Sequence, residues 1–206
     1  LFEILFIFII SLVPLLWFRD NMIIVGHDNI LPLKPDVFLS GRSYTWVEHA
    51  FGQSQSLIMG TLVIHIIDSL PYLIGFTLQN TQKIVYVFWF FLIGLSGYVL
   101  ATVINKESTT FKLTSTILYQ FNFFLLQAWW IGERTKFSGY IALAFVLAVF
   151  LKVYRGELKP FTGVVITSLV LFIFNAGGLF GIPLYGGLFI AIGVFMLYFG
   201  ILSIVR

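Results

Sequence analysis

Long apolar runs separated by short polar stretches dominate this sequence. A helix that crosses about 30 Å of hydrocarbon needs about 20 mostly apolar residues. Runs of this kind predict six membrane spans, over residues 1–18, 84–104, 113–131, 137–151, 161–179 and 183–205. Pro14 predicts a kink within the first span, because proline lacks the N–H that a helix interior needs. The pattern therefore predicts an all-α polytopic membrane protein, organised as a single transmembrane module over residues 1–206.

A further apolar run, Ile58–Leu78, is not expected to cross the membrane. His65 and Asp68 lie in its middle, and Pro71 interrupts helical hydrogen bonding. A charge at the bilayer centre costs at least about 2.5–3.5 kcal/mol. We therefore predict two short helices that lie on the membrane surface with a bend between them. They are Ser56–Ile67 and Ser69–Phe76, with the bend at Asp68-Ser69-Leu70-Pro71.

The composition reinforces this interpretation and excludes other classes. Hydrophobic residues make up 59% of the chain and charged residues 10%, whereas a soluble domain carries about 25% charged residues. A soluble enzyme and a disordered chain are excluded on that basis. The net charge of +3 is too small and too scattered for a nucleic-acid-binding surface. Because both ends fall in apolar runs, we expect the sequence to be a piece of a longer protein.

The long loop between the first two spans, residues 19–83, concentrates the polar side chains. Loops of this length are usually functional. Within it, Pro32 and Pro35 predict an extended path, and Ser43–Phe51 predicts a short amphipathic helix at the membrane surface. The count of Lys and Arg on the two sides is even, but the compact loops on the other side carry the denser basic clusters, which favours an external position for this loop.

One motif in this loop carries a resemblance to a known family. The tetrapeptide Gly26-His27-Asp28-Asn29 is followed by Leu31-Pro32-Leu33-Lys34-Pro35, and polar residues recur at Tyr119–Asn122 in the third span. Together with the face-lying helices before the second span, this layout resembles the GT-C fold. That fold belongs to membrane glycosyltransferases that use polyprenyl-phosphate sugars, and the layout is most similar to the large arabinofuranosyltransferases of cell-wall synthesis.

The resemblance implies a catalytic base and a chemistry. An acidic residue in the first external loop is the base in such enzymes, and here it matches Asp28, although His27 separates it from the glycine that many members place directly before the acid. The second acid used by some members has two candidates here, Glu48 and Asp68. The implied reaction is an inverting transfer to an acceptor in the cell envelope, which would be a glycan, a lipid or a protein on the extracytoplasmic face.

The chemistry of that reaction selects further candidates. A base must remove the proton of the acceptor hydroxyl as it attacks the anomeric carbon. The leaving lipid phosphate needs a cation, which Arg or Lys supplies. We expect Arg42, Arg134 and Lys136 to serve the phosphate. We expect His27, Asn29 and Glu48 to contact substrate beside the catalytic Asp28.

Several alternatives stay open. A divalent metal bound by His27, Asp28, Glu48 and His49 is one, although this spacing matches no known ligand pattern; the sequence indicates no other cofactor with certainty. A transporter or flippase predicts charged or broken helices at mid-membrane in both halves of the chain. A non-catalytic scaffold subunit predicts that Asp28 is dispensable. Polar residues of the third span, Gln120, Asn122 and Gln127, either form interhelical hydrogen bonds or line an acceptor groove.

Overall fold

The structure, a computed structural model, describes most of the chain between residues 2 and 174. The described residues are 2–20, 22–24, 32–42, 46–47, 53–54, 61–131, 134–174, 186, 190 and 193–194. Nearly all of the sixth predicted span therefore lies outside the described residues, and its prediction is not tested.

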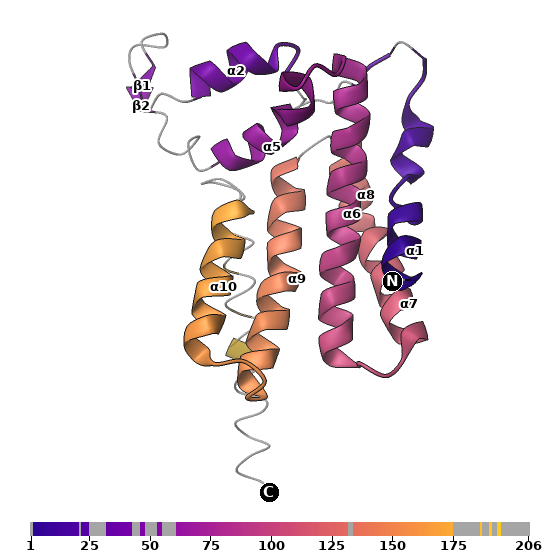
Figure 1. The fold of residues 1–206 in the computed structure, drawn as a ribbon, viewed down its shortest axis with the longest axis vertical. Coiled ribbons are helices and arrows are strands. Elements are labelled where there is room, and N and C mark those ends of the chain that lie inside the picture. Colours follow the sequence, from indigo (N-terminus) through magenta and orange to yellow (C-terminus); the bar gives the residue numbers. More distant parts are fainter. Residues whose placement is uncertain are drawn as a thin grey trace, which may run out of the picture.

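The described elements form a helical bundle with a cap at one end. Figure 1 shows α1 (Phe2–Ile10), α6 (Leu78–Ile104), α9 (Arg134–Tyr154) and α10 (Pro160–Ile173) running along the long axis of the molecule. The helices α2 (Pro35–Arg42) and α5 (Leu62–Leu73) lie across one end, which we call the cap end. The other end is called the distal end. The remaining described elements are η1 (Val13–Trp17), α7 (Thr109–Gln120), α8 (Phe123–Ile131) and the two-residue antiparallel strands β1 (Trp46–Val47) and β2 (Gln53–Ser54).

The helical class is confirmed, and two of the predicted spans appear as long helices. Within the described part of the chain, α6 and residues 136–154 of α9 are long and apolar enough to cross a membrane. The fifth predicted span corresponds to α10, which has 14 residues. The first and third predicted spans are each divided into two shorter helices. The prediction of six crossings therefore remains a prediction.

The first division lies where the sequence predicts it. The α1 helix ends at Ile10 and the chain continues as the 3₁₀ helix η1, which contains Pro14. At the junction, the Ser11 hydroxyl donates to the carbonyl of Ile7 at 2.7 Å. Because Pro14 has no N–H to donate into the preceding turn, the α-helical pattern stops here. The predicted kink is confirmed.

The second division, between α7 and α8, is produced by Asn122. Its side-chain Oδ1 accepts from the Leu125 N–H at 3.1 Å, which caps the start of α8. Its Nδ2 donates to the Tyr119 carbonyl at 2.7 Å and to the Tyr140 hydroxyl at 2.6 Å. The amide therefore satisfies both the end of one helix and the start of the next, and it ties the break to α9.

Three expectations for the loop before α6 are wrong. Asp68 does not bend the chain, because α5 runs unbroken from Leu62 to Leu73 with Pro71 inside it. Pro35 does not extend the chain but begins α2, where its missing N–H costs nothing. Trp46–Val47, inside the predicted helix Ser43–Phe51, pairs instead as a strand with Gln53–Ser54. The expectation that this segment does not cross is consistent with α5 lying across the bundle end (Figure 1).

Close packing of α6 against α7 depends on a glycine. A Cβ at Gly97 would lie 2.8 Å from Tyr119 Cδ1 and 3.0 Å from Tyr119 Cβ. The Tyr119 ring cannot move away easily, since it stacks on Tyr140 at 4.1 Å between ring centroids and donates its hydroxyl to the Tyr140 carbonyl at 2.8 Å. Small residues let membrane helices approach closely in this way.

Gly97→Ala is therefore expected to destabilise the protein. Overpacking a fixed contact costs about 1–3 kcal/mol of unfolding free energy, which denaturation in detergent micelles measures. Gly41→Ala is the matched control, because a Cβ at Gly41 in α2 has nothing within 4 Å and replacing a helical glycine gains about 0.5–1 kcal/mol. An equal effect of the two substitutions would contradict the close approach of α6 and α7.

Candidate functional site

Two glutamines at the start of α6 hold the beginning of the long loop at the cap end. Gln82, which is 2% exposed, accepts from the Ile24 N–H at 2.8 Å and donates to the Ile24 carbonyl at 2.6 Å. Gln79 donates to the carbonyls of Arg19 and Met22 at 3.0 and 3.1 Å. These four hydrogen bonds fix the chain four residues before Asp28.

An aromatic cluster lies beside Ile24, the residue that Gln82 holds. The rings of Trp17, Tyr86 and Trp129 meet one another with centroids 5.2–6.4 Å apart. Together with Ile24 and Leu126 they line a cavity of about 470 Å³. The indole N–H of Trp129 is buried and has no hydrogen-bond partner among the described residues. This cavity is thus almost wholly apolar but borders one donor whose bonding capacity is unused.

A second hollow, the α1–α6 groove, follows the interface of α1 and η1 with α6. Its volume is about 370 Å³, and apart from one lysine its lining is entirely apolar. The lining residues are Phe8, Leu15, Lys83, Ile84, Val87, Phe88 and Phe91. Lys83 lies on the second turn of α6, near the cap end, where its Nζ is 5.9 Å from the centroid of the Phe18 ring. The groove therefore combines a long apolar wall with a single positive charge at one end.

The polar pair on α5 has a structural use. Asp68 is 1% exposed, and its Oδ1 accepts from the Trp89 indole N–H at 2.6 Å. His65, on the same helix face, is also buried, and its ring lies 4.9 Å from the Phe38 ring of α2. The two side chains thus fasten α5 to α6 and α2, which is a packing role for Asp68 rather than an open catalytic one.

The sequence-predicted site residues are described only in part. Asp28, His27, Asn29 and Glu48 lie outside the described residues, so their predicted roles are not tested. Arg42 ends α2 and Arg134 begins α9, but only their backbone is described. Lys136 is partly buried in the first turn of α9. The starts of α9 and α6 lie at the same end of the bundle as α2 and α5 (Figure 1), so the elements that carry these cations share the cap end.

The polar residues of the third predicted span form interhelical bonds where they are buried. Gln120 donates to the Phe90 carbonyl at 3.0 Å and to the Ser11 hydroxyl at 3.3 Å. Asn122 reaches Tyr140, as described above, and Gln127 is exposed. No group of three or more potential metal ligands occurs among the described residues, and the four residues of the predicted metal alternative all lie outside them.

Sequence reasoning missed Lys83 and the two anchoring glutamines. It placed residues 19–83 in the loop and began the span at Ile84, whereas α6 begins at Leu78. A local signal was present: Thr77 is an N-cap, and its hydroxyl accepts from the Asn80 N–H at 3.3 Å.

Comparison of the chain with family profiles, curated proteins and solved structures found no match.

Proposed function

We propose that the chain is a multi-pass membrane protein of the GT-C type that transfers a sugar from a polyprenyl-phosphate donor at its cap end. The observation that carries this proposal is the α1–α6 groove, in which Lys83 is the one charged residue of an otherwise apolar lining. A lipid phosphate has the same division into an apolar chain and an anionic head. The donor would lie with its phosphate at Lys83 and its sugar toward the loop.

A membrane location is supported by the outward-facing side chains. Leu16 of η1, Phe123 of α8 and Phe161 of α10 are 83%, 81% and 80% exposed. Soluble monomers rarely present large contiguous apolar surfaces to water. Since these residues belong to elements that run alongside α6 and α9, lipid contact accounts for their exposure, and we infer that α1–η1, α7–α8 and α10 also cross.

Acid–base chemistry at the cap end supplies the remaining parts of the reaction. Asp28 is proposed as the base that removes the acceptor proton, and it follows the hydrogen-bonded anchor at Ile24 by four residues. Lys83 is added to Arg42, Arg134 and Lys136 as a cation for the departing phosphate. The unused N–H of Trp129 is available to an oxygen of the donor or acceptor.

Lys83→Gln is the variant that tests this proposal directly. The full chain is reconstituted in liposomes with a radiolabelled polyprenyl-phosphate sugar, and label in the acceptor fraction is followed. A charge-assisted bond contributes about 1.5–3 kcal/mol, so kcat/KM for the donor should fall by roughly 10- to 100-fold. Lys159→Gln, an exposed lysine at the start of α10, is the control and should retain wild-type transfer.

Two outcomes would contradict the proposal. Absence of transfer by the wild-type chain with any polyprenyl-phosphate sugar would remove the activity itself. An equal loss in the Lys83 and Lys159 variants would remove the assignment of the groove, because the effect would then report total charge and not position.

A transporter is a second candidate, favoured by the meeting of the two broken helices. Ser11 at the α1–η1 junction and Gln120 at the end of α7 are hydrogen-bonded to each other beside Phe90 of α6. Discontinuous helices that meet within a membrane are typical of transport sites. Movement of a lipid-linked sugar between leaflets without transfer to an acceptor, in the same liposomes, would favour this candidate over the transferase.

A further inference from the structure

A pocket at the distal end lies between the last turns of the two long helices. It has a volume of about 360 Å³, and its lining includes Tyr98, Lys106, Lys152, Arg155 and Glu157. Both α6 and α9 end beside it, at Ile104 and Tyr154. For helices that span a bilayer, this is the level at which lipid headgroups lie.

The charge of this pocket is positive after internal pairing is taken into account. Arg155 donates to the Val103 carbonyl and lies 4.0 Å from Glu157, so it is held against the end of α6. Lys106 and Lys152 are exposed and make no ion pair within the described part of the chain. Lys106, just after the end of α6, and Lys152 of α9 therefore line one pocket, and no described residue forms an ion pair with either of them.

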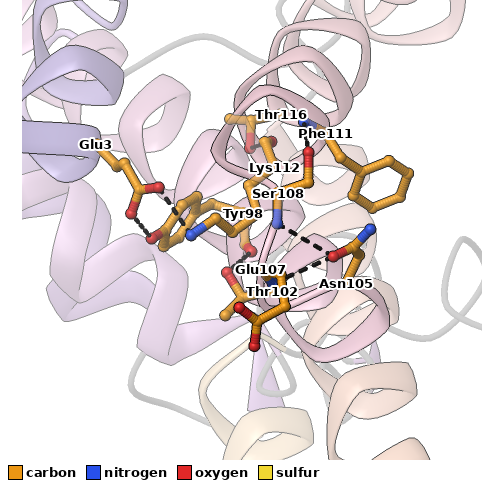
Figure 2. Close-up of polar contacts among 9 residues, drawn as sticks. All are labelled: Glu3, Tyr98, Thr102, Asn105, Glu107, Ser108, Phe111, Lys112 and Thr116. Atoms are coloured by element: carbon orange, nitrogen blue, oxygen red, sulfur yellow. Dashed lines mark hydrogen bonds and ion pairs between the residues drawn. The ribbon is translucent and has the colours of Figure 1, made fainter.

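A third lysine at the distal end, Lys112, forms an ion pair within the protein. Figure 2 shows Lys112 turned toward Glu3 of α1, with Tyr98 beside both. The Lys112 Nζ lies 2.8 Å from Glu3 Oε1, and the Tyr98 hydroxyl donates to the same carboxylate. Lys112 is thus paired within the protein, whereas Lys106 and Lys152 form no such pair with a described residue.

Helix-end electrostatics explain only part of this arrangement. A basic side chain at the C-terminal end of a helix is favoured by the helix dipole, which accounts for Lys152 and Arg155 at the end of α9 and for Lys106 just after α6. It does not explain why Lys106, which follows the end of α6, lines the same pocket as the basic residues of α9. Basic pockets between membrane helices are typical binding sites for anionic lipid headgroups.

We propose that this pocket binds the phosphate headgroup of an anionic phospholipid, with Lys106 and Lys152 as its charge partners and Arg155 as a fixed donor. The acyl chains would lie along the apolar side chains in the last turns of α6 that line the pocket. This proposal rests on the membrane location but not on sugar transfer, and it concerns the end of the bundle opposite to the cap.

Lipid titration of the purified full chain in detergent tests the proposal without any sugar donor. Short-chain phosphatidylglycerol is the probe, and phosphatidylcholine of the same chain length is the neutral-headgroup comparison. Because one lysine near the headgroup contributes about 1 kcal/mol, the dissociation constant for phosphatidylglycerol should rise about fivefold in Lys152→Gln. The double variant Lys106→Gln with Lys152→Gln should raise it roughly 25-fold.

Lys159→Gln is the matched control, since it removes one exposed positive charge at the same end outside the pocket. It should leave the affinity within twofold of wild type. Equal weakening by Lys159→Gln, equal binding of phosphatidylcholine, or displacement of the lipid by inorganic phosphate at matching concentration would each overturn the assignment. Failure here would leave the transfer assay unaffected, and failure of transfer would leave this titration unaffected.

Discussion

Asp28→Asn is expected to lower the rate of sugar transfer by about 10²–10⁴-fold, the range that a positioned general base contributes. Asn keeps the size and the hydrogen-bonding oxygen of the side chain but cannot accept a proton from the attacking hydroxyl. The loss should appear in kcat, and the KM for the polyprenyl donor should change little, because the base acts on the acceptor. The reconstituted full chain and the labelled-donor assay provide both constants.

Asp36→Asn is the control for this prediction. Asp36 is the same residue type in the same loop, and it is exposed in the first turn of α2. We expect the transfer rate of Asp36→Asn to stay within about threefold of wild type. A surface substitution usually changes the stability of the protein by no more than about 0.5 kcal/mol, so the loop should stay folded. Wild-type kcat in Asp28→Asn would exclude Asp28 as the base, whereas equal losses in both variants would point to loop structure.

The long helices were predictable because lipid and sequence leave few alternatives. An apolar run of about 20 residues has to satisfy its backbone internally, which only a helix does within one segment. This reasoning located α6 and α9, although it began α6 six residues late. The error came from treating residues 78–83 as loop, whereas Thr77 caps a helix that begins at Leu78, and the side chains of residues 79 and 82 bond to the loop from its first turns.

The division of the third predicted span could not be read from local sequence. An asparagine in an apolar run either bonds to another helix or caps a new one. Asn122 does both, because Tyr140 on α9 supplies a hydroxyl at 2.6 Å while Leu125 supplies an N–H. Only the packing of α9 beside the break makes this arrangement favourable, and that packing depends on residues 18 positions away.

The candidate site, too, could be predicted from the sequence only in part. A motif in consecutive residues nominated Asp28, which stays a prediction because it lies outside the described residues. The α1–α6 groove has no motif, since it arises where Phe8 of α1 and Leu15 of η1, seven residues apart, meet side chains that recur every third or fourth residue of α6. Lys83 becomes a candidate only when its place at the end of that groove is known.

Trp89→Ala is expected to have the largest effect on stability, lowering the free energy of unfolding by about 3–5 kcal/mol. The Trp89 side chain is fully buried at the centre of the main core cluster. Its loss would leave a cavity and remove the bond by which α6 holds α5. Urea denaturation in mixed micelles, followed by circular dichroism, would measure the change.

Two further variants separate packing from hydrogen bonding. Trp89→Phe keeps most of the ring but removes the N–H, so it should cost about 1–3 kcal/mol, the range for a lost buried hydrogen bond. Phe88→Ala is the neighbouring control: Phe88 is 38% exposed, and its truncation should cost less than either. If Trp89→Ala cost no more than Phe88→Ala, the core would not be centred on Trp89. The cap would then have to be held by another contact, because α5 and α6 are joined by residues 74–77, where the φ of 102° at Gly75 marks a turn and not a continuous helix.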